Sequence, residues 1–141
     1  MLYIILALLF YTAAIMLGTI ASRNTNSNLV SAIMNAISAI IPIIVVFPIV
    51  NKKLFESGRL GILMAVLSGI AIAFFTLALN KSFQVNKVAI VSPIVFGGAI
   101  FLSAILSAIF FKEKVSTFQM FGLAFLGMGL ITIIYAAATG K

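Results

Sequence analysis

Long apolar stretches separated by short polar segments dominate the chain. Five of them stand out, at residues 2–21, 29–50, 60–79, 88–111 and 118–138. Each has about the 20 residues that an α-helix needs to cross roughly 30 Å of hydrocarbon. None alternates polar and apolar residues as the strands of a membrane β-barrel do. The pattern therefore predicts an all-α integral membrane protein, a single transmembrane domain over residues 1–141 with five transmembrane helices.

The short polar segments carry residues typical of helix ends. Residues 22–28 predict a polar turn, with Asn28 as the N-cap of the second helix. Asn86 is expected to cap the fourth helix, and Ser116 with Gln119 has the spacing of a capping box before the fifth. Connections this short make successive helices antiparallel neighbours. No Lys or Arg precedes the first stretch, which favours a permanent span over a cleaved signal peptide.

The composition agrees with a lipid environment and argues against an enzyme. Hydrophobic residues make up 64% of the chain and charged residues 8%, far from the balance of a soluble domain. Cysteine and histidine are absent, and the two acids, Glu56 and Glu113, lie in different connecting segments. The chain therefore lacks the residues of a thiol nucleophile, a serine–histidine triad, a thiolate or imidazole metal site, or a paired-carboxylate hydrolase. We expect neither catalysis nor a metal or cofactor.

Positive charges are spread almost evenly over the two sides of the predicted membrane domain. The net charge is +7, but the basic residues form no patch, which suits lipid headgroups rather than nucleic acid. Five spans place basic residues 52, 53, 59, 112 and 114 on one side and 23, 81, 87 and 141 on the other. The positive-inside rule orients a chain by the difference in basic residues between its two sides, and a difference of one favours either orientation only weakly. Two interpretations stay open: the chain inserts in both orientations, or loop charges such as Lys52 and Lys53 decide a single one.

Polar and small residues form stripes on three of the predicted helices. The stripes comprise residues 31, 35, 38 and 42 in the second helix, 61, 65, 69, 73, 76 and 80 in the third, and 92, 96, 99, 103 and 107 in the fourth. For the third helix we favour close packing, in which hydroxyls and amides bond between helices. For the second and fourth we favour a cavity lined by uncharged polar groups, because these helices contain Pro42 and Pro93. Each proline leaves a carbonyl, that of Ser38 or Ala89, without its helical donor, and transport pathways use such carbonyls.

The fifth predicted helix differs from the others. Its non-bulky residues are Gly122, Gly127 and Gly129, and its polar residues gather near its end. Such a helix suits packing or dimerisation better than the wall of a pathway. We therefore expect the three glycines at a contact between helices.

Three motifs in the last two stretches carry a resemblance to a known family. Residues 88–98 contain a Ser-Pro pair near the start of a span, residues 110–116 contain a Phe-Phe-x-Glu-Lys turn at its end, and residues 121–131 are rich in glycine. In these features the chain resembles the EamA-like domain of the drug/metabolite transporter superfamily. The first three stretches resemble that domain in number, length and spacing.

The resemblance implies a transporter assembled from two inverted repeats. Family members usually have ten spans in two five-span repeats of opposite topology, whereas this chain looks like one repeat. A second copy is therefore expected to pair with it in inverted orientation. The related small multidrug resistance proteins rely on a carboxylate in their first span, where this chain has Tyr11 and Thr12. Proton-coupled export of cations is not expected, because no ionisable group lies within a span to carry the proton.

These inferences together predict a secondary transporter in the plasma (inner) membrane of a prokaryote. We expect it to move a small uncharged or zwitterionic metabolite by alternating access, as an antiparallel homodimer surrounded by membrane lipids and without nucleic-acid partners. The expected substrate-binding residues are Asn35, Ser38, Pro42, Thr76, Ser92, Pro93 and Phe96, together with Tyr11 and Thr12. Of these, Asn35 and Ser92 are expected to hydrogen-bond the substrate and Phe96 to pack against it. Two alternatives stay open: a flippase for lipids or lipid-linked sugars, and an accessory membrane subunit that transports nothing itself.

Overall fold

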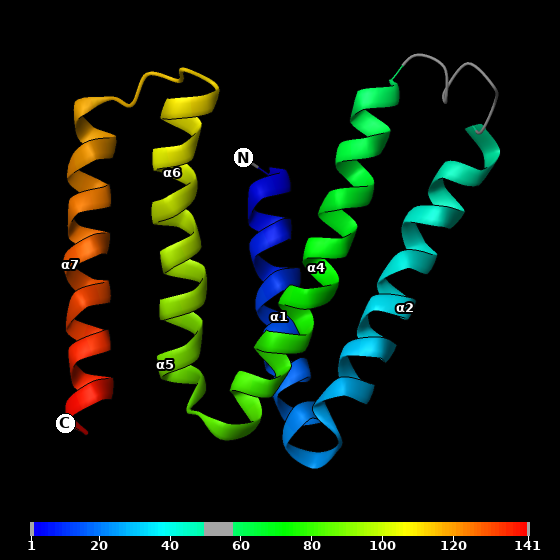
Figure 1. The fold of residues 1–141 in the computed structure, drawn as a ribbon, viewed down its shortest axis with the longest axis horizontal. Coiled ribbons are helices and arrows are strands. Elements are labelled where there is room, and N and C mark those ends of the chain that lie inside the picture. Colours follow the sequence, from blue (N-terminus) through cyan, green and yellow to red (C-terminus); the bar gives the residue numbers. More distant parts are fainter. Residues whose placement is uncertain (1, 50–57, 141) are drawn as a thin grey trace. The chain divides into compact units, whose positions relative to one another are not determined.

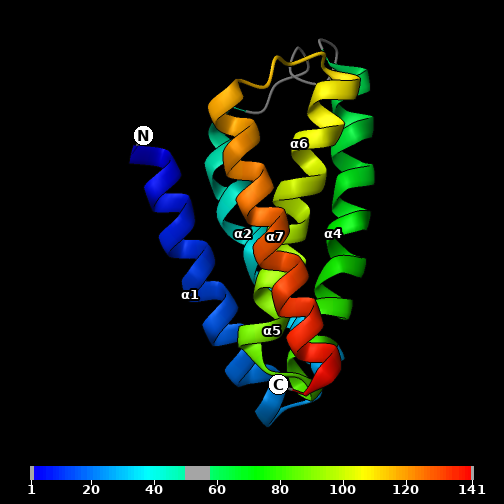
Figure 2. The same cartoon turned by 90° about the vertical axis from the view of Figure 1, so that its left-hand side faces the viewer.

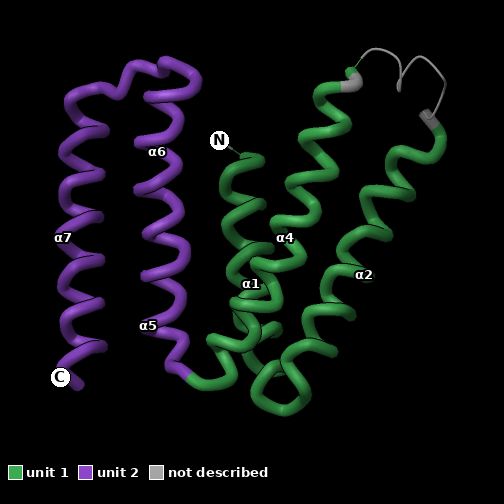
Figure 3. Tube along the Cα trace, viewed as in Figure 1, with its two compact units in different colours: residues 1–85 green, residues 86–141 purple. Residues whose placement is uncertain are grey.

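The computed structural model describes residues 2–49 and 58–140, and every regular element in these ranges is helical (Figure 1). The chain divides into two compact units, residues 1–85 and 86–141 (Figure 3). Predictions that fall on the Lys52–Lys53 pair, on Glu56, on residue 50 or on Lys141 lie outside the described residues.

Unit 1 contains three long helices that succeed one another in antiparallel order (Figures 1 and 2). The elements are α1 (Leu2–Asn24), α2 (Ser27–Val46), the 3₁₀ turn η1 (Phe47–Ile49) and α4 (Arg59–Val85). The three long helices pack against one another, and their buried residues gather where α1 meets α2: Gly18, Thr19, Ser22, Ser27, Val30, Ser31, Leu79, Asn80 and Phe83. Toward the opposite end the helices diverge, and their side chains are exposed.

Unit 2 is an antiparallel pair of helices, one of which contains a widened turn. The elements are α5 (Val88–Ser92), the π-turn η2 (Pro93–Gly97), α6 (Gly98–Phe110) and α7 (Thr117–Thr139). Pro93 has no backbone N–H for the Ala89 carbonyl, and the π-turn begins at this proline. At the other end of the turn, a Cβ on Gly97 would lie 2.9 Å from Leu130 Cδ2, so any larger residue there would require the Leu130 side chain of α7 to move.

Five helices in the described chain are long and apolar enough to cross a membrane: Leu2–Asn24, Ser27–Val46, Leu60–Val85, Val88–Phe110 and Thr117–Thr139. Their outward apolar side chains are largely exposed; Phe118, for example, is 89% exposed. Water would oppose such a surface, whereas hydrocarbon accommodates it. The prediction of an all-α protein with five membrane-spanning helices is confirmed, and the chain is a multi-pass membrane protein.

The connection between the first two helices is shorter than predicted. Residues 22–24 belong to α1 and residues 27–28 to α2, which leaves Thr25 and Asn26 as the connection. The prediction that Asn28 caps α2 is wrong, because the cap is Asn26. Its Oδ1 accepts hydrogen bonds from the backbone N–H groups of Asn28 (2.9 Å) and Leu29 (3.3 Å).

Of the predicted caps at the N-terminal ends of α5 and α7, the first is wrong and the second is confirmed. The N-cap before α5 is Lys87 rather than Asn86, and the Lys87 side chain makes no capping hydrogen bond. The capping box before α7 is confirmed. The Ser116 hydroxyl accepts from the Gln119 N–H (3.3 Å), and the Gln119 Oε1 accepts from the Ser116 N–H (2.8 Å).

Helix α4 continues past Leu79, where its apolar stretch ends, to Val85. Asn80 and Phe83 are both 1% exposed, because they pack against α1 and α2. The Arg23 Nε donates to the Phe83 carbonyl (3.3 Å), one of the last four carbonyls of α4, which have no partner inside the helix. Tertiary packing and this cap extend the helix beyond its hydropathy pattern.

Candidate functional site

A buried polar network joins the three helices of unit 1. At its centre is Asn80 of α4, whose Oδ1 accepts from the Ser22 hydroxyl of α1 (3.1 Å). The Asn80 Nδ2 donates to the Ser31 hydroxyl of α2 (2.9 Å). Ser22, Ser31 and Asn80 are each no more than 1% exposed. One buried amide side chain thus bonds to both neighbouring helices.

The same network extends along the contact between α2 and α4. The Ser31 hydroxyl also lies 3.0 Å from the Thr76 carbonyl, and the Asn35 Nδ2 donates to the Thr76 hydroxyl (2.7 Å). Asn35 Nδ2 donates as well to the Ser31 carbonyl (2.8 Å). In this arrangement Asn35 and Thr76 bond to each other and hold two helices together, so the packing interpretation of the third-helix stripe holds for Thr76 and Asn80. It does not hold within unit 1 for the small residues of the stripe at 61, 65, 69 and 73, which are exposed, and a Cβ on Gly61 or Gly69 would meet nothing within 4 Å.

The remaining predicted binding residues of unit 1 lie in separate places. Tyr11 lines a small cavity of about 90 Å³ together with Thr76 and Asn80. Ser38 lines an apolar groove of about 420 Å³ between α1 and α2. Pro42 lines a shallow hollow at the far end of α2. Unit 1 therefore brings Tyr11, Asn35 and Thr76 close together. The Ser38 hydroxyl donates to the Asn35 carbonyl (3.1 Å), although its side chain faces the apolar groove, and Pro42 lies apart from the others.

Thr12, the last predicted residue of unit 1, is exposed on α1. Its hydroxyl donates to the Leu8 carbonyl one turn earlier (2.8 Å). Helical serines and threonines commonly bond in this way, and the bond satisfies the hydroxyl within its own helix.

Ser92, Pro93 and Phe96 lie together in unit 2, at the start of and within the π-turn, and all three are half-buried. The Ser92 Oγ is shielded from solvent, yet it has no hydrogen-bond partner within the described residues. The hydroxyls of Ser103 and Ser107, farther along the same helix, both donate to carbonyls three residues back (2.9 and 3.0 Å). Ser92 therefore differs from Ser103 and Ser107, because its hydroxyl makes no hydrogen bond to the helix backbone.

The three glycines of the fifth helix have different surroundings. A Cβ on Gly127 would lie 3.4 Å from the Phe101 ring of α6, so this glycine lies at the contact of α6 with α7. A Cβ on Gly122 or Gly129 would meet nothing within 4 Å. These two glycines leave open places on the surface of α7.

Sequence reasoning missed the central role of Asn80 and the participation of Ser22. Asn80 was placed in a packing stripe and Ser22 in a connecting turn. The spacing of Gly18 and Ser22, one helical turn apart, is the signal that favours a contact face at the end of α1. Within residues 2–49 and 58–140, no three side chains of the metal-ligating types come together.

The family comparison agrees with this membrane architecture. The chain belongs to the EamA-like transporter family, whose profile matches residues 1–135. The protein is therefore a multi-pass membrane protein of a transporter family within the drug/metabolite transporter superfamily. Comparisons with curated proteins and with solved structures gave no significant match.

The network predicts that Asn80→Ala destabilises unit 1. Removal of the hydrogen bonds to Ser22 and Ser31, each worth about 0.6–1.7 kcal/mol in membrane proteins, should lower the free energy of unfolding by about 1–3 kcal/mol. The measurement is unfolding by sodium dodecyl sulfate in mixed micelles, followed by circular dichroism.

Asn24→Ala is the matched control, because the exposed Asn24 amide bonds only to the Ile20 carbonyl of its own helix. We expect this variant to unfold within about 0.5 kcal/mol of the parent chain. Equal effects of the two substitutions would contradict a bridging role for Asn80.

Proposed function

We propose that the chain is a secondary transporter that moves a small uncharged or zwitterionic metabolite by alternating access. It works as an antiparallel homodimer in the plasma (inner) membrane of a prokaryote. The observation that carries the proposal is the buried, unpartnered Ser92 hydroxyl beside the π-turn at Pro93.

A buried hydroxyl without a hydrogen bond costs about 1–3 kcal/mol. A serine in a helix can avoid this cost by donating to a carbonyl three or four residues back. The Ser92 hydroxyl is instead unused, and it adjoins a π-turn, a feature frequent at functional sites. A substrate that offers an acceptor to this hydroxyl would remove the cost on binding. Pro93, which withholds a donor from the Ala89 carbonyl, supplies an acceptor on the same stretch of helix.

The charge distribution supports an uncharged or zwitterionic substrate. No Asp or Glu lies in any described helix, and Glu113 lies between α6 and α7. A proton-coupled exporter of cations needs an ionisable group within the membrane. Uncoupled facilitation or exchange fits this chain better.

Two sequence features support an inverted pair of copies. The family profile covers nearly the whole chain, which has five candidate spans, whereas the resemblance implies ten spans for a complete transporter. The basic residues differ by one between the two sides of a five-span chain, which permits both orientations. Two inverted copies would reproduce the two-repeat architecture common in secondary transporters.

Transport in proteoliposomes tests the role of Ser92. Radiolabelled neutral sugars and zwitterionic amino acids form the first panel, and any compound taken up is used with the variants. Ser92→Ala should lower its uptake about two- to tenfold, the effect of one lost hydrogen bond. The same substitution should leave the thermal midpoint unchanged or raise it, because no protein hydrogen bond is lost.

Thr132→Val is the control for that experiment. The Thr132 hydroxyl donates to the Met128 carbonyl of its own helix (2.9 Å), so its removal should leave uptake unchanged. Uptake that is unaffected by Ser92→Ala would refute the assignment of Ser92. Failure of the whole panel, with tight co-purification of another protein, would favour the accessory subunit.

Labelling of a single cysteine tests the inverted pair, since the chain has no cysteine of its own. Thr25→Cys is the suitable site, because Thr25 is exposed and the neighbouring Asn26 must remain as the cap of α2. Intact cells are labelled with an impermeant thiol reagent before and after permeabilisation. We expect about half of the molecules to react from outside. Labelling of all or none would show a single orientation and rule out the inverted homodimer.

A further inference from the structure

Unit 2 contains a groove between α6 and α7 that the proposed transport does not use. It has a volume of about 410 Å³, within the range of about 300–1,000 Å³ typical of small-molecule sites. Its deeper walls are apolar and consist of Ile100, Ala104, Leu123 and Leu126. Gly122 also lines the groove, and the absence of a side chain there leaves the space open.

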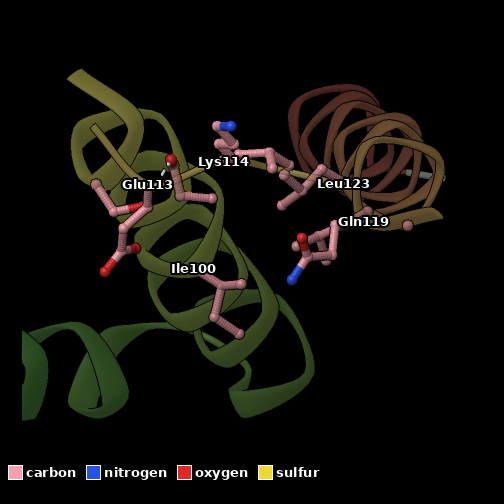
Figure 4. A pocket seen from close by; sticks show the side chains of 10 residues that line it. Ile100, Glu113, Lys114, Gln119 and Leu123 are labelled. Carbon is pink, nitrogen blue, oxygen red and sulfur yellow. Dashed lines mark hydrogen bonds between the residues drawn. The ribbon is translucent and has the colours of Figure 1, made fainter. Parts of the chain in front are cut away.

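The mouth of the groove is polar. It is formed by Ser107, Glu113, Lys114 and Gln119, of which three are labelled in Figure 4. Residues 111–116 join the ends of two membrane-spanning helices, so this mouth lies at the level of the lipid headgroups. Gln119 uses its Oε1 in the capping box, which leaves its Nε2 amide group to donate elsewhere.

Glu113 is the one acidic residue among residues 2–49 and 58–140, and its carboxylate has no partner there. Lys112 and Lys114 flank it in the sequence, yet within residues 58–140 the carboxylate makes neither a salt bridge nor a hydrogen bond. Lys112 has a positive φ of 54°, which turns the backbone where α6 ends. The groove mouth therefore presents a free carboxylate and an ammonium group on adjacent residues.

We propose that this groove binds a phosphatidylethanolamine molecule of the surrounding bilayer. One acyl chain lies between α6 and α7, the headgroup ammonium bonds to the Glu113 carboxylate, and the phosphate faces Lys114 and the Gln119 amide. A primary ammonium offers three donors to a carboxylate, whereas an anionic headgroup without an amine would be repelled by it. The apolar walls and the paired charges at the mouth thus match one class of lipid. The inference does not depend on the transported substrate.

Native mass spectrometry of the full chain in detergent micelles tests this site. Phosphatidylethanolamine and phosphatidylglycerol with the same acyl chains are added in equal amounts, and the bound lipids are counted. The parent chain should retain phosphatidylethanolamine about two- to fivefold more than phosphatidylglycerol, as expected for an exposed charge pair. Glu113→Gln should remove this preference, while Lys112→Gln, outside the groove, should keep it.

A second pair of variants tests the groove itself. Gly122→Leu fills it and should reduce bound phosphatidylethanolamine at least twofold, whereas Gly129→Leu, at an equally open place of the same helix outside the groove, should not. Equal effects of the two leucines, or equal retention of both lipids by the parent chain, would overturn the proposal.

A third measurement distinguishes lipid from a second copy of the chain in the groove. Ala104→Cys places one thiol on the groove wall of an otherwise cysteine-free chain. Efficient oxidation to a disulfide-linked dimer would assign the groove to a protein contact and overturn the lipid site. Glu113→Gln changes an exposed residue outside any helix, so it carries the test even where a leucine variant fails to fold.

Discussion

The arrangement of unit 1 depends on one buried side chain, the amide of Asn80. In lipid, apolar surfaces gain little by leaving the solvent, so helices associate through close packing and through hydrogen bonds. Asn80 bonds to Ser22 of α1 and to Ser31 of α2. These two hydrogen bonds form only where the end of α1, the start of α2 and the end of α4 meet. They also explain why α4 remains helical beyond its apolar stretch, because a helical backbone keeps Asn80 and Phe83 on the buried face.

Unit 2 is held together in a different way, by close contact at glycines. Gly97 lies against Leu130, and Gly127 lies against the ring of Phe101. Contacts of this kind use shape rather than polar groups, so the hydroxyl of Ser92 is left without a structural bond. The two units thus differ in their polar side chains: Asn80, Ser22 and Ser31 join the helices of unit 1, whereas the Ser92 hydroxyl of unit 2 has no hydrogen-bond partner within the described residues.

The sequence predicts the number and the approximate extent of the membrane helices, because hydropathy over about 20 residues is a strong signal. It predicts their ends less well. The apolar run stops at Leu79 while α4 continues to Val85, since burial against α1 and α2 outweighs the polarity of Asn80. Asn28 and Asn26 are equally good caps by residue type, and the backbone conformation decides between them.

The candidate site was also predicted only in part. The Ser-Pro pair drew attention to Ser92 and Pro93, and the structure adds the π-turn and the unpartnered hydroxyl. Neither feature follows from residue type, because each depends on local backbone geometry. Asn35, which was expected to hydrogen-bond a substrate, bonds to Thr76 in this structure. Such pairing depends on the rotation of one helix against another, which a single sequence does not specify.

The connection of Thr25 and Asn26 limits how α1 and α2 can move relative to each other. Two residues span only about 7 Å when fully extended, so the end of α1 and the start of α2 stay adjacent once both helices have formed. Any separation of the two helices therefore has to open at their far ends, away from the hydrogen bonds of Asn80 to Ser22 and Ser31.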